Sequence, residues 1–251
     1  MNVVLVTGAS SGFGEAICRK LIADGYKVIG TARREDKLKS LATELGDDFL
    51  PFQLDVTRKD AVDNLLLGLP DAFKQIDILI NNAGLALGME PAYQANYADW
   101  ETMVQTNVIG LMHLTRVVLP TMVERNFGYI INLGSTAGNY AYRGGNVYGA
   151  SKAFVKQFSA NLRTDLFGKK IRVTNIEPGL CGGTEFSNVR FHGDDHQADA
   201  VYQNVDFITP EDIANTVSWL VNSPVHFNVN SIEIMPTAQA PAGLAVSKDM
   251  K

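Results

Sequence analysis

Val3-Val4-Leu5-Val6-Thr7-Gly8-Ala9-Ser10-Ser11-Gly12-Phe13-Gly14 is the stretch that decides the fold of this chain. Its first four residues are apolar and mostly β-branched, which predicts a buried strand, and an amphipathic helix is expected over residues 12–24. Glycines at positions 8, 12 and 14 permit a tight turn between the strand and the helix, and they let backbone N–H groups approach a pyrophosphate. Because the glycine-rich turn lies between a strand and a helix, it favours a nucleotide-binding site over an ordinary turn.

The same alternation of short apolar runs and amphipathic stretches continues along the chain. Residues 76–80 and 129–133 are almost continuously apolar, which is typical of a strand that helices cover on both faces. Repeated β-α units predict a single-domain α/β fold over residues 1–251, a Rossmann-like doubly wound parallel sheet of about seven strands with helices on both faces. Strands are expected at 3–7, 28–32, 50–54, 76–80, 129–133, 171–176 and 231–235, and helices at 12–24, 35–45, 58–68, 99–124, 146–167 and 210–222.

Composition excludes several classes of protein. The 251 residues are 46% hydrophobic and 20% charged, which is ordinary for a globular protein and unlike a disordered chain. The net charge of -5 leaves no basic surplus for a nucleic-acid partner. Cys18 and Cys181 are far apart, so neither a disulfide scaffold nor a metal site is expected. No signal-peptide pattern and no apolar run of about 18 residues is present, so we expect a cytoplasmic protein without a membrane partner.

Two segments depart from the alternation. Residues 178–209 are rich in glycine and polar residues and have little apolar periodicity. A segment of that length is commonly an active-site lid or a disordered loop, and we expect a substrate lid over residues 180–209. Residues 236–251 form a C-terminal tail without a helix signal, which either frays or packs against a neighbouring subunit.

The end of the second strand indicates which nucleotide binds. Folds that prefer NAD place an acidic residue here to accept from the ribose 2′-hydroxyl, whereas arginine suits a 2′-phosphate. Arg33 and Arg34 stand at this point, so NADP is the expected cofactor, although two arginines can also be solvated charges at a helix start. Asp55 follows the third strand, where its carboxylate either accepts from the adenine amino group or is a plain loop residue.

Candidate catalytic residues lie in Tyr148-Gly149-Ala150-Ser151-Lys152 and after the fifth strand. Tyr148 and Lys152 are four apart on one face of a predicted helix. A free tyrosine titrates near pH 10, and a nearby ammonium lowers that pKa, which makes Tyr148 a usable proton donor or acceptor. Ser135 follows the strand at the carboxyl edge of the sheet, where ligands of open α/β sheets bind.

Taken together, these motifs resemble the short-chain dehydrogenase/reductase family over almost the whole chain, with further matches at Asn81-Asn82-Ala83-Gly84 and Pro178-Gly179. The resemblance implies a catalytic triad of Ser135, Tyr148 and Lys152, extended by Asn107, and a homotetramer built through the helices at 99–124 and 146–167. It also implies hydride transfer between a nicotinamide and a carbonyl carbon. The residues expected to bind the cofactor are Gly8, Ser10, Gly12, Phe13, Gly14, Arg33, Arg34, Asp55, Val56, Asn82, Ala83, Gly84, Tyr148, Lys152, Pro178, Gly179 and Thr184.

Residues 82–91 and 177–191 resemble one subgroup of that family, the bacterial NADP-dependent 3-hydroxy acid dehydrogenases. The resemblance implies oxidation of serine, allo-threonine or 3-hydroxypropanoate, or reduction of an acid semialdehyde such as malonic semialdehyde. A related branch reduces sulfoacetaldehyde to isethionate and is the alternative. A non-catalytic NADP-binding sensor is a third reading, which the complete set of catalytic residues disfavours.

A small anionic substrate needs a cation near Tyr148. Arg143 enters the catalytic helix and Arg190 lies in the lid, so both are candidates alongside Ser135, and either arginine can instead be a surface charge. His192 lies in the same lid. His113 and His226 are expected to be packing or surface residues, and Cys181 to fill space. Tyr93 and Trp100 flank the loop after the fourth strand, where they either line the pocket or pack in the core.

Overall fold

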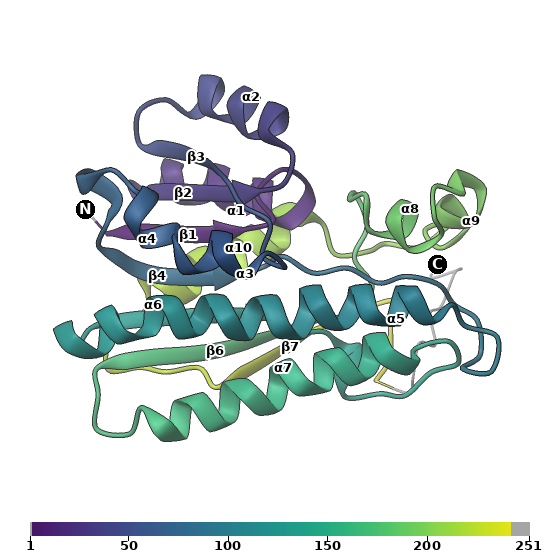
Figure 1. Ribbon diagram of the computed structural model, residues 1–251. Helices are drawn as coiled ribbons and strands as arrows, with labels where there is room; N and C mark the ends of the chain where they lie inside the picture. The colour runs from purple at the N-terminus through teal and green to yellow at the C-terminus, as the bar shows by residue number, and fades with distance from the viewer. Residues whose placement is uncertain (1, 242–251) are drawn as a thin grey trace.

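The computed structural model describes residues 2–241. The strands form one seven-stranded parallel sheet in the order β3-β2-β1-β4-β5-β6-β7 (Figure 1). The chain order reverses between β1 and β4, which places a topological switch point at the centre of the sheet. The predicted Rossmann-like doubly wound sheet is therefore confirmed. The strands are β1 (Val3–Thr7), β2 (Lys27–Ala32), β3 (Phe49–Gln53), β4 (Ile76–Asn81), β5 (Gly128–Leu133), β6 (Ile171–Pro178) and β7 (Ser231–Ile234).

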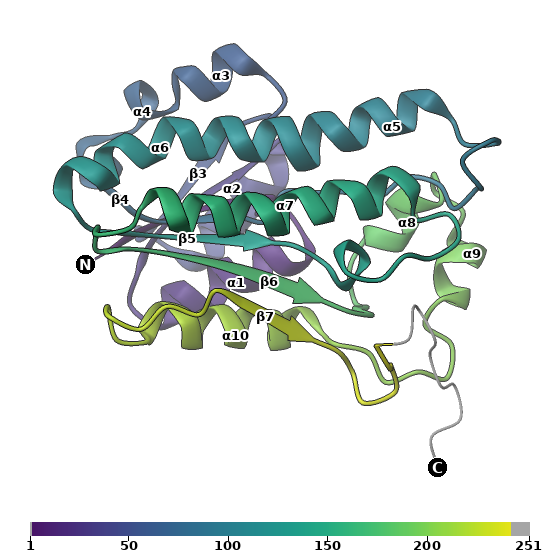
Figure 2. The same cartoon turned by 90° about the horizontal axis from the view of Figure 1, so that it is seen from below.

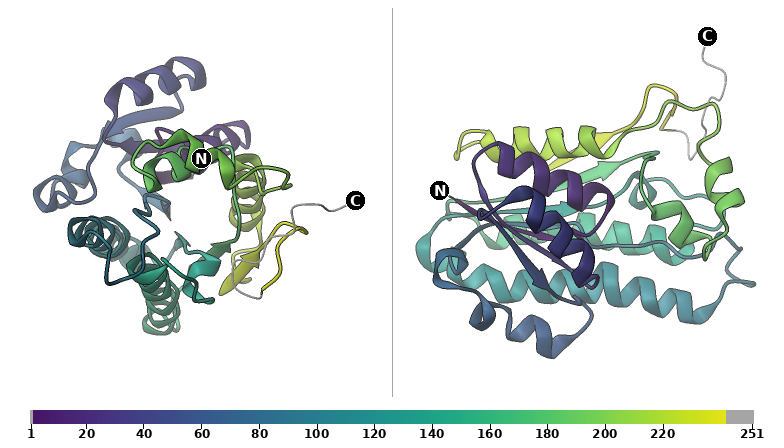
Figure 3. Two further views of the ribbon diagram at one scale, coloured as in Figure 1. Left: turned by 90° about the vertical axis from the view of Figure 1, so that its right-hand side faces the viewer. Right: turned by 90° about the horizontal axis from the view of Figure 1, so that it is seen from above.

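Helices cover both faces of the sheet (Figure 2). One apolar layer joins α1, α2 and α10 to the sheet, and a second joins α3, α4, α6 and α7 to its other face. Two short helices, α8 and α9, stand at the carboxyl ends of the strands (Figure 3). The helices are α1 (Gly12–Ala23), α2 (Glu35–Leu45), α3 (Lys59–Asp63), α4 (Leu65–Gly68), α5 (Tyr97–Val104), α6 (Leu111–Arg125), α7 (Asn146–Asp165), α8 (Phe186–Arg190), α9 (Asp195–Ala200) and α10 (Pro210–Asn222), with short 3₁₀ turns at Asp71–Phe73 and Thr136–Gly138.

Three predicted segments differ in detail from the structure. The helix expected at 58–68 is divided at Asn64, whose side-chain amide donates to the carbonyl of Asp60 at 2.8 Å. The helix expected at 99–124 contains a π-helical turn, η2 (Gln105–Gly110), between α5 and α6. The lid at 180–209 is not a bare loop, because it holds α8 and α9, which were too short to show apolar periodicity.

The switch point is held by reciprocal hydrogen bonds between β1 and the loop that follows β4. The Thr7 hydroxyl oxygen accepts from the backbone N–H groups of Asn82 (3.0 Å) and Ala83 (2.9 Å). In return, the side-chain amide of Asn82 donates to the Thr7 carbonyl at 2.8 Å. These bonds fix the two loops that form the central crevice.

The first part of the C-terminal tail packs against its own chain. Ala238 and Gln239 are buried, and the Gln239 Oε1 accepts from the backbone N–H of Leu180 at 2.7 Å, where the lid begins. The remainder of the predicted tail, residues 242–251, lies outside the described residues. Within residues 2–241, no helix has the length and apolar character needed to cross a bilayer.

Thr7→Val should lower the free energy of unfolding by about 1–3 kcal/mol, because two partly buried N–H groups lose their acceptor beside the buried Thr7 side chain. Urea denaturation measures the change. Thr43→Val is the matched control, since the exposed Thr43 hydroxyl only donates to the Lys39 carbonyl, and it should change stability by less than about 0.5 kcal/mol. Equal losses in the two variants would mean that the junction adds nothing to stability.

Candidate active site

A cavity of about 520 Å³ runs along the carboxyl edge of the sheet. At one end it is lined by Arg33 and Arg34, and at the other by Arg190. Its walls come from the glycine-rich loop, the ends of β2 to β6, α7 and the lid. Of the residues predicted from sequence, those that line it are Gly8, Ser10, Gly12, Phe13, Arg33, Arg34, Asp55, Val56, Asn82, Ala83, Gly84, Ser135, Tyr148, Lys152, Pro178, Gly179, Thr184 and Arg190.

The glycine-rich loop provides a cradle for a pyrophosphate. Gly8 and Gly12 have positive φ angles of 70° and 54°, which other residues rarely adopt. A Cβ atom at Gly14 would lie 2.1 Å from the carbonyl oxygen of Gly8, so only glycine allows this close approach. No side chain caps the N-terminus of α1 at Ser11, which leaves its first N–H groups free for an anion. A dinucleotide fits this geometry.

The nucleotide end of the cavity carries both predicted arginines. Arg34 donates to the hydroxyl oxygens of Ser10 (3.2 Å) and Ser11 (2.8 Å), while Arg33 is exposed beside it. One oxygen of Asp55 accepts from the backbone N–H and the hydroxyl of Thr57, at 2.9 and 2.8 Å. Asp55 therefore closes its own turn and also lines the cavity. Two cations with no acidic residue at the end of β2 suit a 2′-phosphate.

Tyr148, Ser135 and Lys152 converge where β5 and α7 meet the lid. Tyr148 is buried, and burial raises its pKa, while a hydrogen bond with Ser135 and the charge of Arg190 act in the opposite direction. Lys152 is buried as well, and burial lowers its pKa to about 8. Its ammonium lies 5.8 Å from the centre of the Tyr148 ring and donates to the Leu133 carbonyl at 2.7 Å.

The raised pKa of Tyr148 differs from the sequence-based expectation that the neighbouring ammonium lowers it. The reason is the direction in which Lys152 points, because its ammonium is engaged with the Leu133 carbonyl and not with the phenol. In the chain alone, burial is therefore the dominant influence on Tyr148. Tyr148 is a protonated donor in this arrangement.

Asn107 lies in the π-helical turn η2 and positions the loop after β4. Its Oδ1 accepts from the Leu85 N–H at 2.9 Å, and its Nδ2 donates to the Leu85 carbonyl (2.8 Å) and to the Ser151 hydroxyl (3.0 Å). A Cβ atom at Gly84 would lie 3.3 Å from the Asn107 Oδ1 and 3.4 Å from the Lys152 Nζ. Asn107 thus ties this loop to the helix that carries Tyr148 and Lys152, which is a positioning role.

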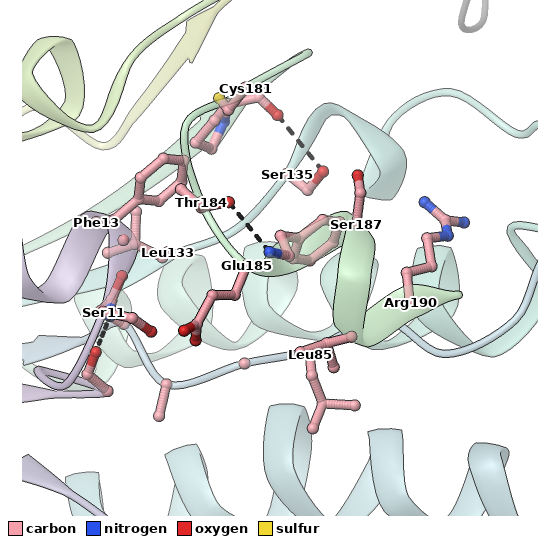
Figure 4. Close-up of a pocket in the computed structure, with 18 of the residues that line it drawn as sticks. Ser11, Phe13, Leu85, Leu133, Ser135, Cys181, Thr184, Glu185, Ser187 and Arg190 are labelled. Atoms are coloured by element: carbon pink, nitrogen blue, oxygen red, sulfur yellow. Dashed lines mark hydrogen bonds between the residues drawn. The ribbon is translucent and has the colours of Figure 1, made fainter. Parts of the chain in front are cut away.

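The segment predicted as a lid, residues 180–209, brings Arg190 next to Tyr148. Its guanidinium carbon lies 5.6 Å from the centre of the Tyr148 ring, and its Nη2 donates to the Tyr142 hydroxyl at 2.8 Å. Figure 4 shows Arg190 at the far end of α8 from Glu185. Arg143, the other candidate, is exposed and is not among the residues that line the cavity. The structure therefore separates the two arginines that the sequence left as alternatives.

Sequence reasoning missed several side chains that complete the cavity. Phe186 packs on Tyr148 at 5.8 Å between ring centres, and the Ser187 and Tyr202 hydroxyls lie 2.6 Å apart. Their signal was weak because they belong to a lid without periodic pattern. Two aromatic residues near the loop after β4 do not line the cavity: Tyr93 is exposed, and Trp100 packs on an apolar cluster. Of the histidines, His113 contacts Asp63 and His192 contacts Asp99. His226 is exposed.

The family model of the short chain dehydrogenases matches residues 2–195. The chain belongs to that family. The dehydrogenase is 60% identical to a probable NADP-dependent dehydrogenase of Haemophilus influenzae, over 99% of this chain and 98% of the relative. It is also 58% identical to an NADP-dependent 3-hydroxy acid dehydrogenase of Escherichia coli K12 (98% and 99% covered) and 50% identical to a serine 3-dehydrogenase of Agrobacterium fabrum (99% of each chain covered).

Solved structures agree with this assignment. The closed form of a serine dehydrogenase complexed with NADP⁺ superposes with a TM-score of 0.95 at 59% identity, covering 97% of this chain and 98% of that one. A serine dehydrogenase from Escherichia coli gives a TM-score of 0.85 at 52% identity, covering 95% and 99%. The dehydrogenase therefore shares its complete fold with enzymes of known structure.

Tyr148→Phe should lower kcat by about two to four orders of magnitude, because it removes only the oxygen that exchanges a proton with the substrate. Cofactor affinity, measured by fluorescence titration, should be unchanged. Tyr26→Phe is the matched control, since the Tyr26 hydroxyl contacts Asn222 and Tyr26 is not among the residues that line the cavity, and this variant should keep full activity. A Tyr148→Phe enzyme with near-normal kcat would contradict the assignment.

Buried Lys152 should make the stability of the dehydrogenase depend on pH. Between pH 8 and 10.5 the unfolded chain still holds the Lys152 proton while the folded chain has released it, so the free energy of unfolding rises with pH in this window. Below pH 8 both states are protonated and the cost of burying the charge is constant.

Lys152→Met removes this contribution, so its stability relative to the unmodified chain should fall by about 2–3 kcal/mol between pH 7 and pH 10.5. Urea denaturation at the two pH values measures the difference. Lys169→Met, at an exposed lysine, is the control and should show no such change. A difference between Lys152→Met and the unmodified chain that is independent of pH would refute the shift.

Proposed function

We propose that the dehydrogenase uses NADP(H) to interconvert a small 3-hydroxy acid, such as serine or 3-hydroxypropanoate, and the corresponding acid semialdehyde. The observation that carries the proposal is the position of Arg190, whose guanidinium carbon lies 5.6 Å from the centre of the Tyr148 ring. A small substrate could therefore contact this cation and the proposed proton donor at the same time. The relatives named for NADP-dependent 3-hydroxy acid and serine dehydrogenation support the same chemistry.

Arg190 has unused capacity for a carboxylate. Its Nε donates to the Gly88 carbonyl (3.3 Å) and one Nη2 proton to the Tyr142 hydroxyl. Within residues 2–241, the other three N–H donors of the guanidinium have no partner, and two of them can bind a carboxylate in bidentate geometry. The short separation of the guanidinium and the Tyr148 ring favours a small acid as substrate. A neutral substrate would leave the guanidinium without an anion.

Ser135, Tyr148 and Lys152 divide the work at the reacting oxygen. When bound, NADP(H) supplies or accepts the hydride. In the reductive direction Tyr148 donates its phenolic proton to the substrate oxygen, and Ser135 hydrogen-bonds the same oxygen. In the oxidative direction Tyr148 takes that proton back. Lys152, whose ammonium donates to the Leu133 carbonyl and lies 5.8 Å from the centre of the Tyr148 ring, would bind the ribose of the cofactor.

The second candidate is a sulfoacetaldehyde reductase, because a guanidinium also matches the geometry of a sulfonate.

A homotetramer stays part of the proposal, supported by the partly exposed apolar residues Val104, Ile109 and Met112 along α5, η2 and α6. The cytoplasmic location predicted from sequence stays a prediction. A non-catalytic sensor is disfavoured because Ser135, Tyr148 and Lys152 line the cavity and Asn107 donates to Ser151 on the helix that carries Tyr148 and Lys152.

The proposal is tested by initial rates with NADP⁺ and serine, and with NADPH and malonic semialdehyde, sulfoacetaldehyde or propanal. We expect the acidic aldehydes to exceed neutral propanal by at least about tenfold in kcat/KM, because a charge-assisted hydrogen bond contributes about 1.5–3 kcal/mol. Equal rates for the acidic aldehydes and propanal would contradict an acid substrate, and a preference for sulfoacetaldehyde would favour the second candidate.

Arg190→Ala should lower kcat/KM for the acidic aldehydes by about ten- to a hundredfold more than for propanal, because it removes the anion contact, while the loss of its bonds to Gly88 and Tyr142 affects every substrate alike. Arg143→Ala is the matched control, since it removes an arginine that does not line the cavity, and it should leave all the substrates unaffected. If Arg143→Ala were the selective variant instead, the anion site would have been assigned to the wrong arginine.

A further inference from the structure

Glu185 of the lid makes an ion pair with Arg34 at the nucleotide end of the cavity. Its carboxylate oxygens lie 2.8 Å from the Arg34 Nη2 and 3.1 Å from Nη1. Arg34 precedes α2, whereas Glu185 directly precedes α8, 151 residues later in the chain. Both side chains line the cavity, and Figure 4 shows Glu185 pointing toward the loop that carries Ser11. The pair therefore connects the lid to the nucleotide site.

Both edges of the Arg34 guanidinium that can bind an anion in bidentate geometry are occupied in this arrangement, although one Nη1 proton has no partner among the described residues. Its Nε and Nη2 donate to the Ser10 hydroxyl, Nη2 also donates to the Ser11 hydroxyl, and the Glu185 carboxylate takes Nη1 and Nη2. The hydrogen bond from Arg34 holds the pKa of Glu185 below its usual range, so the carboxylate is charged at neutral pH. Arg33 also lines the cavity, and its side chain has no hydrogen-bonded partner in the part of the chain that the structure describes.

We propose that Glu185 is an internal substitute for the cofactor's 2′-phosphate, and that it leaves Arg34 when that phosphate binds. The inference rests on the proposed use of NADP(H). A planar guanidinium binds one carboxylate or phosphate in bidentate geometry, so the two anions compete for Arg34 while Arg33 stays available to the phosphate. A neutral ribose 2′-hydroxyl does not displace a carboxylate from a guanidinium, so NAD(H) leaves the pair intact.

The arrangement makes the lid respond to the kind of cofactor. Glu185 stands directly before α8, which ends at Arg190, the residue proposed to hold the substrate anion. Displacement of Glu185 by a 2′-phosphate therefore frees the start of the helix whose other end contacts the substrate. Glu185 would therefore help to determine cofactor specificity from the lid, whereas the two arginines that favour NADP(H) follow the end of β2.

The experiment uses 2′,5′-ADP and 5′-AMP as probes, because they differ only in the 2′-phosphate and do not reach the catalytic residues. Calorimetric Kd values are measured for the unmodified enzyme, for Glu185→Gln and for Asp199→Asn. Asp199 is the matched control, an exposed lid carboxylate that makes no contact with Arg34.

Glu185→Gln should tighten the binding of 2′,5′-ADP by about two- to fivefold, the effect expected for an exposed ion pair, whose side chains here are 42% and 51% exposed. It should leave the binding of 5′-AMP unchanged, and Asp199→Asn should alter the binding of neither probe. In an Arg34→Ala background the effect of Glu185→Gln on the affinity for 2′,5′-ADP should vanish, because the guanidinium for which Glu185 and the 2′-phosphate compete is then absent.

Two failures are distinguishable. If the unmodified enzyme binds 2′,5′-ADP no more tightly than 5′-AMP, the proposed use of NADP(H) is wrong. If it prefers 2′,5′-ADP but Glu185→Gln leaves that affinity unchanged or weakens it, the competition is overturned while the proposed function stands. Equal tightening by Asp199→Asn would also overturn it, since a general charge effect would then explain the result.

Discussion

The Thr7 hydroxyl sets the geometry on which the rest of the site depends. It binds the two backbone N–H groups that follow β4, and so it fixes the distance between the glycine-rich loop and the loop of Asn82 to Gly84. The first loop holds the open N-terminus of α1, and the second rests on Asn107 and Lys152. A hydroxyl buried between two strands therefore determines where a pyrophosphate and a proton donor lie relative to each other.

Signals that are local in sequence predicted most of this arrangement. The glycine spacing, the apolar strands and the four-residue separation of Tyr148 and Lys152 each describe neighbours within one element, and all were found where expected. The pKa of Tyr148 was less accessible. Its direction depends on burial and on where the Lys152 ammonium points, and both follow from packing between elements.

The residues that the sequence left undecided depend on contacts between distant segments. Arg143 and Arg190 had equal claims as anion ligands, because each is an arginine in a polar stretch near the catalytic motif. Arg190 turns into the cavity through bonds to Gly88, 102 residues away, and to Tyr142. The pairing of Arg34 with Glu185 is also long-range, and the π-helical turn at Asn107 has no apolar pattern of its own.

Arg190 and Gly88 are joined twice, since the Gly88 N–H donates to the Arg190 carbonyl at 2.9 Å and the Arg190 Nε donates to the Gly88 carbonyl. The same two bonds that dock the lid on the loop after β4 also orient the guanidinium. Breaking these two bonds would release the guanidinium together with the backbone of α8, so any movement of this segment away from the loop after β4 would also dismantle the proposed anion site.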